Sequence, residues 1–547
     1  MLSLLLLTLT LTLTLPPTHA SYNTHACSAP SLSTPFPLPP LSSSLLPLRL
    51  HTLVRHGDRT PSVWLFSRAY DAHWTCSLMP HATGSSPDLL SPSSARSFVF
   101  ANTGWPAGNC SSSWLTQKGS RQLYSLGASI AQAWILRSPD SSTTTSNPEA
   151  TTSTSNPEAN SVEDRNDAYG WGGTSLGDVI VAARNLKRQP IALRSTDVPR
   201  TKFSLTSFWA GVDSVTSAHP LGPIDPAADV LTYLGPDDSL QPGVGNSCSA
   251  FGKLNEATRN GDVMRAYMES VADKVAEIDH VFADILNISL PFSDPNYNWQ
   301  YLMDNIQARI CHDKILPDVV TPQLFQDIDD IASTRWQIQI NAPNAVRLGY
   351  ASLFADLVAE FQAIRDGNLD SLPPPITFWS AHDSTVAYVM AGLRAGMGGF
   401  NGVWPPYASN LHLLTLRHNV TGSLYVLPLY NGDILDIPCN LNVTHPIPGL
   451  CTISDFISLL NTTALAPDAY AAACRVPPSP PSPPPGPSPS PSPSSLDRAV
   501  SGGLLGGFLG LVFGIAIGIA ATLFASKRWR TSSDRSPATP LLPNNSS

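Results

Sequence analysis

The chain contains Leu53-Val54-Arg55-His56-Gly57-Asp58-Arg59-Thr60-Pro61, an apolar run that ends at a histidine between two arginines. A neutral imidazole can attack phosphorus, and guanidinium groups give paired hydrogen bonds to phosphate oxygens. The glycine after the histidine allows the backbone to approach an anion. A surface cluster of arginine and histidine before a turn is the alternative, but the fixed positions of R-H-G-x-R-x-P seldom coincide by chance. The motif therefore predicts a phosphate site, with His56 as nucleophile and Arg55 and Arg59 as phosphate ligands.

Other short apolar segments end in a similar way. Residues 46–54 and 376–380 lack a helical period, as expected of buried parallel strands whose carboxyl ends hold a ligand. Residues 120–136, 262–288 and 344–365 have apolar residues three and four positions apart, which predicts helices, and residues 411–430 alternate like a hairpin. The pattern is that of an α/β protein with a mostly helical middle.

The strand predicted at 376–380 is followed by two residues that can complete a phosphoryl-transfer site. Such a site needs a proton for the leaving alkoxide and additional groups that bind the transferring phosphate. Asp383 is the candidate general acid, and His382 is a candidate phosphate ligand. A helix N-cap by Asp383 is the alternative, and the two interpretations are compatible.

A third strand is predicted at the start of the segment 191–201. It carries Arg194 near its end, which would place a third guanidinium on the phosphate. For Arg194 or Arg200 the alternative is a surface salt bridge with Asp197, which is equally common for such a segment taken alone.

Four motifs occur in the order typical of the histidine acid phosphatase family, the second branch of the histidine phosphatases, which the chain resembles from about residue 46 to 474. They are R-H-G-D-R-T-P at 55–61, L-T-x-x-G-x-x-Q-x-x-x-L-G at 115–127, L-R-S-T-D-x-x-R-T at 193–201 and S-A-H-D at 380–383. The resemblance implies an α/β, phosphoglycerate mutase-like fold with a central mixed sheet flanked by helices. It also implies a smaller, mostly helical lobe at about 202–370.

The resemblance also implies a role for each candidate residue. His56 would attack phosphorus and become a phosphohistidine, Asp383 would protonate the leaving group, and the phosphate ligands would be Arg55, Arg59, Arg194 and His382. Water would then hydrolyse the phosphoenzyme. No metal or other cofactor is expected, because arginines neutralise the charge that magnesium neutralises in other phosphotransferases. We therefore expect hydrolysis of phosphate monoesters at acid pH.

The ends of the chain predict a single-pass type I membrane protein. Residues 1–20 resemble a secretory signal peptide, and residues 504–525 are uncharged, apolar and long enough to span a bilayer. The basic residues that follow place the tail, 526–547, in the cytosol and the N-terminal part outside, at the cell surface or in a lysosome or vacuole. Glycines at four-residue intervals in the span would allow a homodimer, although membrane helices are commonly rich in glycine.

Two low-complexity stretches divide the chain, one inside the predicted catalytic domain, 27–476, and one directly after it. Residues 138–167 repeat Thr-Ser-Asn-Pro-Glu-Ala and are too polar for a core, which predicts a disordered insertion. Residues 477–495 alternate proline and serine, which predicts an extended stalk. Five sequons precede the span and are candidate glycosylation sites: Asn109, Asn287, Asn419, Asn442 and Asn461.

Eight cysteines behind a predicted signal peptide favour four disulfides, and none has the C-x-x-C spacing of a zinc site. The resemblance implies the pairs Cys248–Cys474 and Cys439–Cys451. The family's P-P-Y-A-S-C reads P-P-Y-A-S-N at 405–410, so Cys311 lacks its usual partner. The cysteines left unpaired in the prediction are Cys27, Cys76, Cys110 and Cys311.

A formal charge of −9 and the lack of a basic stripe argue against nucleic acid as a partner. Two alternative functions stay open. Phytases of the family often replace His-Asp by His-Ala-Glu and have a more basic helical lobe, whereas this chain keeps His382-Asp383 and is rich in acidic residues at 262–330, which favours a broad acid phosphatase. Loss of a catalytic residue would have favoured a stalked adhesion or receptor module, and none is lost.

Overall fold

The computed structural model describes residues 22, 24–29, 44–66, 74–76, 110–136, 176–185, 188–217, 219, 231–233, 238–241, 248–283, 285–286, 291–367, 374–394, 399–439, 447 and 449–475. All belong to the first of two compact units, which are 1–476 and 477–547. The predicted signal peptide, insertion, stalk, membrane span and tail lie outside the described residues. None of the helices in the described part has the length and apolarity that crossing a bilayer requires.

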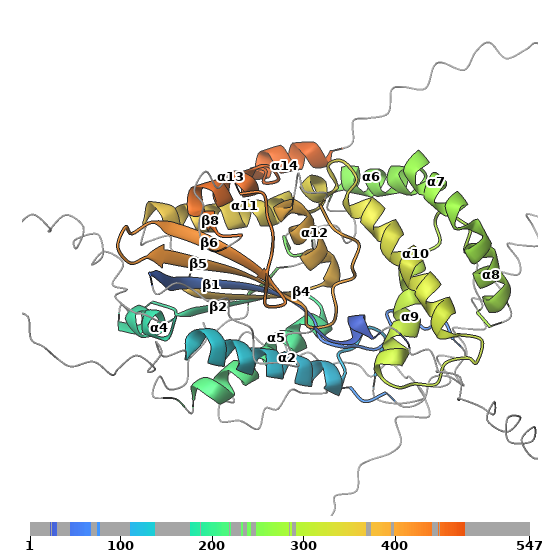
Figure 1. Ribbon diagram of the computed structural model, residues 1–547, viewed down its shortest axis with the longest axis horizontal. Helices are drawn as coiled ribbons and strands as arrows, with labels where there is room; N and C mark the ends of the chain where they lie inside the picture. The colour runs from blue at the N-terminus through green and yellow to red at the C-terminus, as the bar shows by residue number, and fades with distance from the viewer. Residues whose placement is uncertain are drawn as a thin grey trace, which may run out of the picture. The chain divides into compact units, whose positions relative to one another are not determined.

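A mixed sheet forms the centre of the fold (Figure 1). The strand order is β3 (Leu231–Tyr233), β2 (Ile191–Thr196), β4 (Ile376–Ala381), β1 (Leu45–Arg55), β5 (Asn410–His418), β6 (Leu424–Tyr430) and β7 (Asp433–Ile434), with β8 (Cys451–Thr452) beside β6. The first four strands are parallel, and β1, β5 and β6 pair antiparallel. The mixed α/β sheet and the hairpin predicted from the sequence are confirmed.

The register of the parallel strands brings the sequence motifs to one edge of the sheet. Arg55 at the end of β1 lies opposite Ala381 at the end of β4, and Ser195 of β2 lies opposite Ser380. The backbone N–H of His56 donates to the carbonyl of Ala381 at 3.0 Å. His56 and His382 therefore leave the sheet side by side, at the carboxyl ends where ligands of parallel sheets bind.

Helices cover both faces of the sheet (Figure 1). Leu50 and Phe378 share a core with Leu123 and Phe208, whereas Leu53 belongs to a second core that covers the other face. This division follows from the alternation of side chains along a strand. The first face is covered by α2 (Gln117–Ile130), which continues as a π-helical turn at Ala131–Ile135, α4 (Leu176–Asn185) and α5 (Pro199–Thr216); the second is covered by α11 (Ala345–Asp366), α12 (Asp383–Leu393), α13 (Ile453–Asn461) and α14 (Pro467–Cys474).

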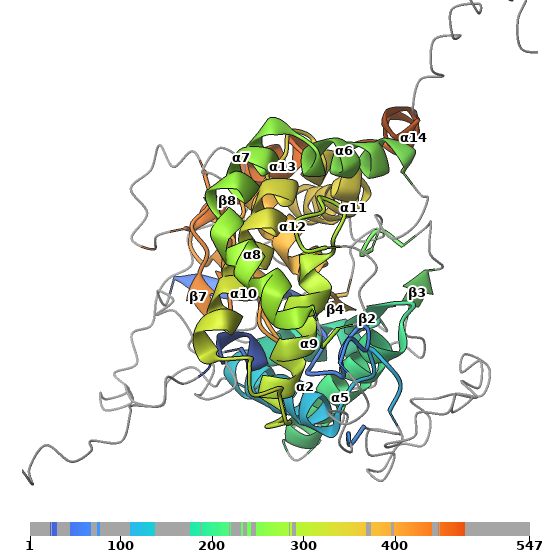
Figure 2. The same ribbon diagram turned by 90° about the vertical axis from the view of Figure 1, so that its right-hand side faces the viewer.

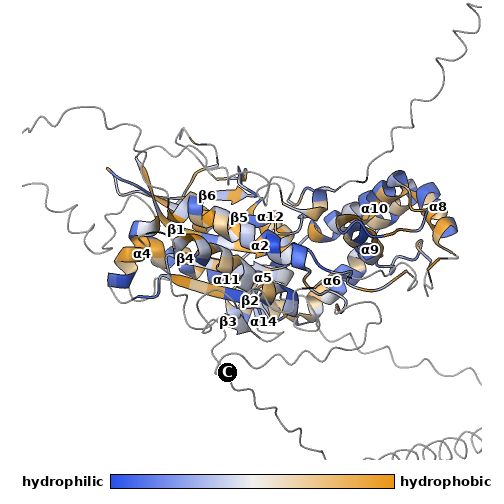
Figure 3. Ribbon diagram, turned by 90° about the horizontal axis from the view of Figure 1, so that it is seen from below, coloured by the Kyte–Doolittle hydropathy of each residue, from blue (hydrophilic) through white to orange (hydrophobic). Residues whose placement is uncertain are grey.

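A helical lobe lies beside the sheet and is seen from its own side in Figure 2. It consists of α6 (Ser249–Arg259), α7 (Asp262–Ser270), α8 (Ala272–Phe282), α9 (Trp299–Cys311) and α10 (Pro322–Ile340). The last four surround their own core, which includes Phe282, Trp299 and Phe325. Figure 3 shows blue and orange residues alternating along α10, as expected of a helix with one face on a core.

The lobe is narrower than the predicted range 202–370. Helices α5 and α11 fall within that range, but both pack on the sheet, because their apolar faces match its two cores. The ring of Phe208 on α5, for example, lies 4.5 Å from that of Phe378 on β4. The single helix predicted at 262–288 is divided at Val271 into α7 and α8.

All eight cysteines are paired. The implied pairs Cys248–Cys474 and Cys439–Cys451 are confirmed. The four cysteines left open pair as Cys76–Cys110 and Cys27–Cys311. Cys311 does not lack a partner, because the N-terminal segment runs beside Tyr407, with backbone hydrogen bonds from Tyr407 to Ala26 and from Ala29 to Tyr407, and brings Cys27 to it.

Candidate active site

His56 is a buried, neutral imidazole at the end of β1. Its Nδ1 lies 2.8 Å from the carbonyl oxygen of Gly57. Because a carbonyl only accepts, Nδ1 carries the proton and Nε2 keeps its lone pair. Burial, together with the nearby Arg200 and Arg55, holds the pKa of His56 well below its ordinary value. The ring therefore presents an unprotonated nitrogen, which is the form that can act as a nucleophile.

Arg55 joins the strand that precedes His56 to the candidate general acid. Its Nη2 lies 2.8 Å from Oδ2 of Asp383, and its Nη1 donates to the carbonyl of Pro405 at 2.5 Å. The guanidinium lies over the ring of Tyr407, with 4.3 Å between its carbon and the ring centroid. These contacts fix the guanidinium plane at the edge of the sheet.

Arg59 is held by the helical lobe. Asp304 of α9 accepts from both of its terminal nitrogens, at 2.8 and 3.1 Å, and also accepts from the backbone N–H of Ser62 at 2.7 Å. A bidentate pair of this kind orients a guanidinium as well as binding it. No sequence motif pointed to Asp304, because it lies about 250 residues from Arg59 in a helix with no special spacing.

His382 and Arg200 form the opposite wall of the site. Arg200, in the first turn of α5, donates from Nη2 to Nδ1 of His382 at 3.2 Å. Since Nδ1 accepts, Nε2 carries the proton and donates to Thr196 Oγ1 at 3.0 Å. Burial and Arg200 lower the pKa of His382 well below its ordinary value. The ring centroids of His56 and His382 are 5.7 Å apart.

Arg194 lies outside this cluster, whereas the sequence predicted it as a third arginine on the phosphate. It precedes the end of β2 by two residues, or about 6.6 Å along the strand. Its guanidinium contacts Ser239 Oγ at 2.8 Å, Asp356 at 3.3 Å and Asp238 at 3.4 Å. Arg200 lies where Arg194 was expected. Helix α5 begins at Pro199, so its first turn, which carries Arg200, faces the site. The signal was the second arginine of L-R-S-T-D-x-x-R-T.

Asp383 is the first residue of α12, after His382 in the N-cap position, so the predicted N-cap belongs to its neighbour. Its carboxylate accepts from Arg55, from Trp404 Nε1 at 3.2 Å and from the N–H of Ser384 at 2.8 Å. Burial alone would raise the pKa of Asp383, but Arg55 and Arg59 outweigh it and hold the pKa below its ordinary value. Asp383 is therefore ionised in the unliganded site.

The arginines leave donors available for an anion. The Nε atoms of Arg55, Arg59 and Arg200 are buried without a hydrogen-bond partner among the described residues. Three guanidiniums face two carboxylates, those of Asp304 and Asp383, so the cluster carries excess positive charge. A buried, unpaired donor is costly, and an oxyanion is the ligand that would satisfy these groups.

The loop after His56 is locked to α2. A Cβ on Gly57 would overlap the carbonyl of Gly119 and the side chain of Leu123. The sequence had suggested that this glycine lets an anion approach the backbone, but in the structure it allows close packing against α2 instead. Its N–H donates to Ser204 Oγ at 3.1 Å. Asp58 N donates to Gln122 Oε1 at 2.9 Å. The second motif, with Gly119 and Gln122, therefore supports the nucleophile's loop.

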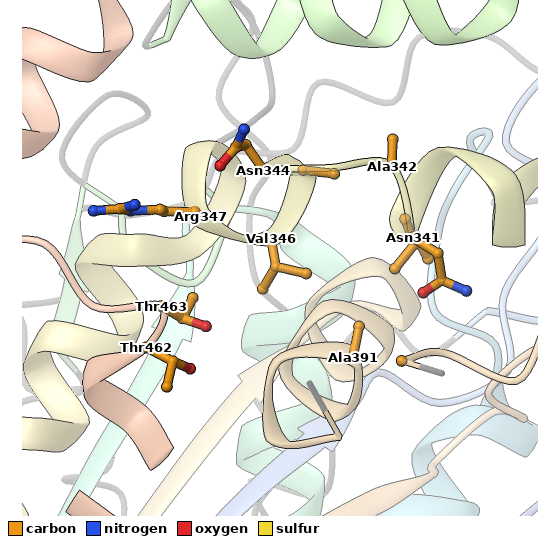
Figure 4. Close-up of a pocket in the computed structure, with 11 residues that line it drawn as sticks. Asn341, Ala342, Asn344, Val346, Arg347, Ala391, Thr462 and Thr463 are labelled. Carbon is orange, nitrogen blue, oxygen red and sulfur yellow. The ribbon is translucent and has the colours of Figure 1, made fainter. Parts of the chain in front are cut away.

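A separate hollow lies away from this cluster. It has a volume of about 470 Å³ and lies where α10 leads into α11. Figure 4 shows Val346 and Ala391 facing it from different helices. Of its described lining residues only Arg347 carries a charge. It offers neither a nucleophile nor a carboxylate, so the His56 cluster is the candidate active site.

No family model matches the chain. Among similar proteins, counting factor 60 of Dictyostelium discoideum is 25% identical over 461 residues, which cover 82% of this chain and 92% of that protein. Lysosomal acid phosphatase of Rattus norvegicus is 22% identical over 301 residues, 53% of this chain and 65% of that protein. Putative acid phosphatase 5 of Caenorhabditis elegans is 22% identical over 407 residues, 74% of each chain.

Solved structures with a similar arrangement include the phytase of Citrobacter braakii, with a TM-score of 0.44 and 13% identity over 79% of this chain and all of that one. The multiple inositol polyphosphate phosphatase of Bifidobacterium longum, in complex with inositol hexasulfate, has a TM-score of 0.45 and 13% identity over 82% of this chain and 98% of that one. The four motifs, together with the two acid phosphatases among these relatives, are consistent with the histidine acid phosphatase family.

Proposed function

We propose that this enzyme hydrolyses phosphate monoesters through a phosphohistidine at His56. The observation that carries the proposal is the unprotonated Nε2 of His56, buried beside the guanidiniums of Arg200, Arg55 and Arg59. Positive groups placed around a developing phosphoryl transition state lower its energy, and the arginines supply them here.

In the proposed first step, Nε2 of His56 attacks phosphorus and the bond from phosphorus to the ester oxygen breaks. The leaving alkoxide takes a proton from Asp383. Arg55, which pairs with Asp383 at 2.8 Å, would turn part of its charge to the phosphate. This change weakens its hold on the carboxylate and raises the pKa of Asp383, so that the acid is protonated when substrate is bound.

In the second step, water attacks the phosphohistidine and the Asp383 carboxylate takes its proton. Inorganic phosphate leaves with this proton, so that His56 is again neutral and Asp383 again ionised. Acid pH suits the cycle, because a phosphate monoester is a monoanion below about pH 6 and brings the proton that Asp383 needs. His56 stays neutral there, because its pKa is depressed.

His382 remains a predicted phosphate ligand with a second task. Its Nδ1 accepts from Arg200 and its Nε2–H donates to Thr196. In the unliganded site it therefore orients Arg200. Contact with phosphate would require Nε2–H to exchange Thr196 for a phosphate oxygen.

The test uses the purified full-length protein with a generic phosphate monoester and EDTA, from pH 4 to pH 8. We expect activity that is highest at acid pH, a trapped, alkali-stable and acid-labile phosphoenzyme, and loss of both in His56→Ala. His280→Ala, an exposed histidine on α8, is the matched control and should behave as wild type. A folded wild type without activity, or an active His56→Ala variant, would refute the proposal. Inositol hexakisphosphate as a second substrate tests the phytase alternative.

We further propose that the enzyme is a glycosylated type I membrane protein, held by residues 504–525 with the site at the cell surface or in a lysosome or vacuole. Four disulfides support an oxidising compartment. In intact cells or vesicles the catalytic unit should be shielded from the cytosol and should lose mass on treatment with a glycosidase. Accessibility from the cytosol would contradict this location.

A further inference from the structure

The helical lobe contains a small polar cavity that the catalytic proposal does not use. Its volume is about 140 Å³, and it lies between the end of α6, the start of α9 and α10. Its lining includes Arg259, Arg335, Trp299, Trp336, Asn298 and Gln339. Cavities for metabolite-sized organic ligands usually exceed about 300 Å³, so this one suits a small ion.

Several donors on the residues that line this cavity lack a hydrogen-bond partner among the described residues. Arg335 is 4% exposed, and its Nη2 donates to the carbonyl of Pro295 at 3.0 Å. Its Nη1, the Nε of Arg259 and the Nε1 of the buried Trp299 have no hydrogen-bond partner. Within the described part of the chain, no carboxylate forms an ion pair with either arginine.

The carboxylates nearest along α10 are already engaged. Asp327 pairs with Lys274, Asp329 accepts from Ser333 at 3.3 Å, and Asp330 accepts from Gln326 at 2.8 Å. Burial, together with the charge of Arg259, lowers the pKa of Arg335 to about 10. The guanidinium still carries its charge at physiological pH, so two cations share a wall of this cavity without a described counter-ion.

We propose that this cavity is a second oxyanion site, which takes one phosphate group between Arg335 and Arg259. Guanidinium and indole N–H groups are donors only, and a tetrahedral anion can accept from all of them at once. The group could be free inorganic phosphate or a second phosphate on a substrate. The site is separate from the His56 cluster and does not depend on the catalytic proposal.

A chain of aromatic contacts joins the cavity to the candidate general acid. Trp336, which lines the cavity, stacks on Trp404 with ring centroids 4.1 Å apart. Trp404 Nε1 donates to Asp383 at 3.2 Å. A bound anion would therefore alter the environment of Trp336, which stacks on the Trp404 that donates to Asp383. Tryptophan fluorescence should report the binding of the anion.

The test is calorimetric titration of inorganic phosphate into the full-length protein. We expect two phosphates per chain in wild type and in His56→Ala. Arg335→Gln and Arg259→Gln should each weaken the second site at least about tenfold and leave the first unchanged, whereas the exposed control Arg347→Gln should keep both. Circular dichroism establishes folding, and if Arg335→Gln does not fold, the more exposed Arg259→Gln decides. Phosphate binding whose stoichiometry and affinities are the same in wild type and in folded Arg259→Gln would overturn the proposal, whatever the stoichiometry of the wild type.

A second arm distinguishes the sources of the anion. If the cavity takes a substrate phosphate, Arg259→Gln lowers kcat/KM for a hexose bisphosphate about tenfold and leaves kcat/KM for the corresponding monophosphate unchanged. If it takes free phosphate, the variant changes neither value and loses only the fluorescence response. The calorimetric arm needs no turnover, so failure of the phosphatase proposal would not be mistaken for failure of this one.

Discussion

Arg200→Gln is expected to impair catalysis far more than Arg194→Gln. Arg200 lies in the first turn of α5, donates to His382 at 3.2 Å and has a buried Nε without a partner. Its loss removes at least one hydrogen bond between charged groups, each worth about 1.5–3 kcal/mol, in the transition state. Because 1.36 kcal/mol corresponds to a factor of ten, kcat/KM should fall about a hundredfold.

Arg194→Gln should instead affect stability. The change removes the charge that faces Asp238 and Asp356 and leaves the buried carboxylate of Asp238 with fewer donors. We expect a loss of about 1–3 kcal/mol in the free energy of unfolding, with kcat/KM within about threefold of wild type.

The assay compares kcat/KM for a generic monoester at a temperature where circular dichroism shows wild type and both variants folded. Urea denaturation supplies the free energies of unfolding. A greater loss of kcat/KM in Arg194→Gln than in Arg200→Gln would refute the assignment of Arg200 to the phosphate site. Equal losses would show that neither arginine is placed as the geometry implies.

Asp304→Asn should lower the free energy of unfolding by about 3 kcal/mol in urea denaturation, since it leaves Arg59 buried without its bidentate partner; an unchanged midpoint would contradict this. Replacing Cys27 and Cys311 together by serine should remove up to about 5 kcal/mol, because the bridge closes a loop of 284 residues, and a thermal unfolding midpoint equal to that of wild type would be inconsistent with this bridge. Burial lowers the pKa of His412 to about 3, so its contribution to stability is present above pH 6.5 and is lost as the pH falls toward 3. By pH 4 this lowers the free energy of unfolding by about 3 kcal/mol. In His412→Gln the free energy of unfolding should therefore fall less between pH 7 and pH 4 than in wild type. An equal fall in the variant and in wild type would refute this source of acid sensitivity.

Local patterns were sufficient to predict the strands and the meeting of the candidate catalytic residues at one edge of the sheet. Strands β1 and β4 are apolar runs that stop at charged turns, and such runs are buried wherever the rest of the chain lies. His56 and His382 follow these ends directly and Asp383 is the next residue, so their placement at one edge of the sheet follows from parallel pairing. Which of Arg194 and Arg200 reaches the site depends on where β2 ends and where α5 begins. An error of a few residues in these boundaries was enough to select Arg194 in place of Arg200.

The contributions of the rest of the chain could not be predicted in this way. Asp304 meets Arg59, and Cys27 meets Cys311, only through the packing of the helical lobe against the sheet. Neither residue has a local signature, since one carboxylate in a helix resembles any other. The extent of the lobe depended on whether α5 and α11 found their partner surface on the sheet or on other helices.

The packing of Gly57 against Gly119 has a consequence for how a substrate is bound. The loop that carries His56 is in contact with the start of α2, and its Gly57 and Asp58 N–H groups already donate to Ser204 and Gln122. The loop therefore loses its conformational entropy when the chain folds, and binding of a ligand does not have to order it again. Binding of phosphate should accordingly proceed without a slow rearrangement of the nucleophile, at a rate set by diffusion and by the field of the arginines.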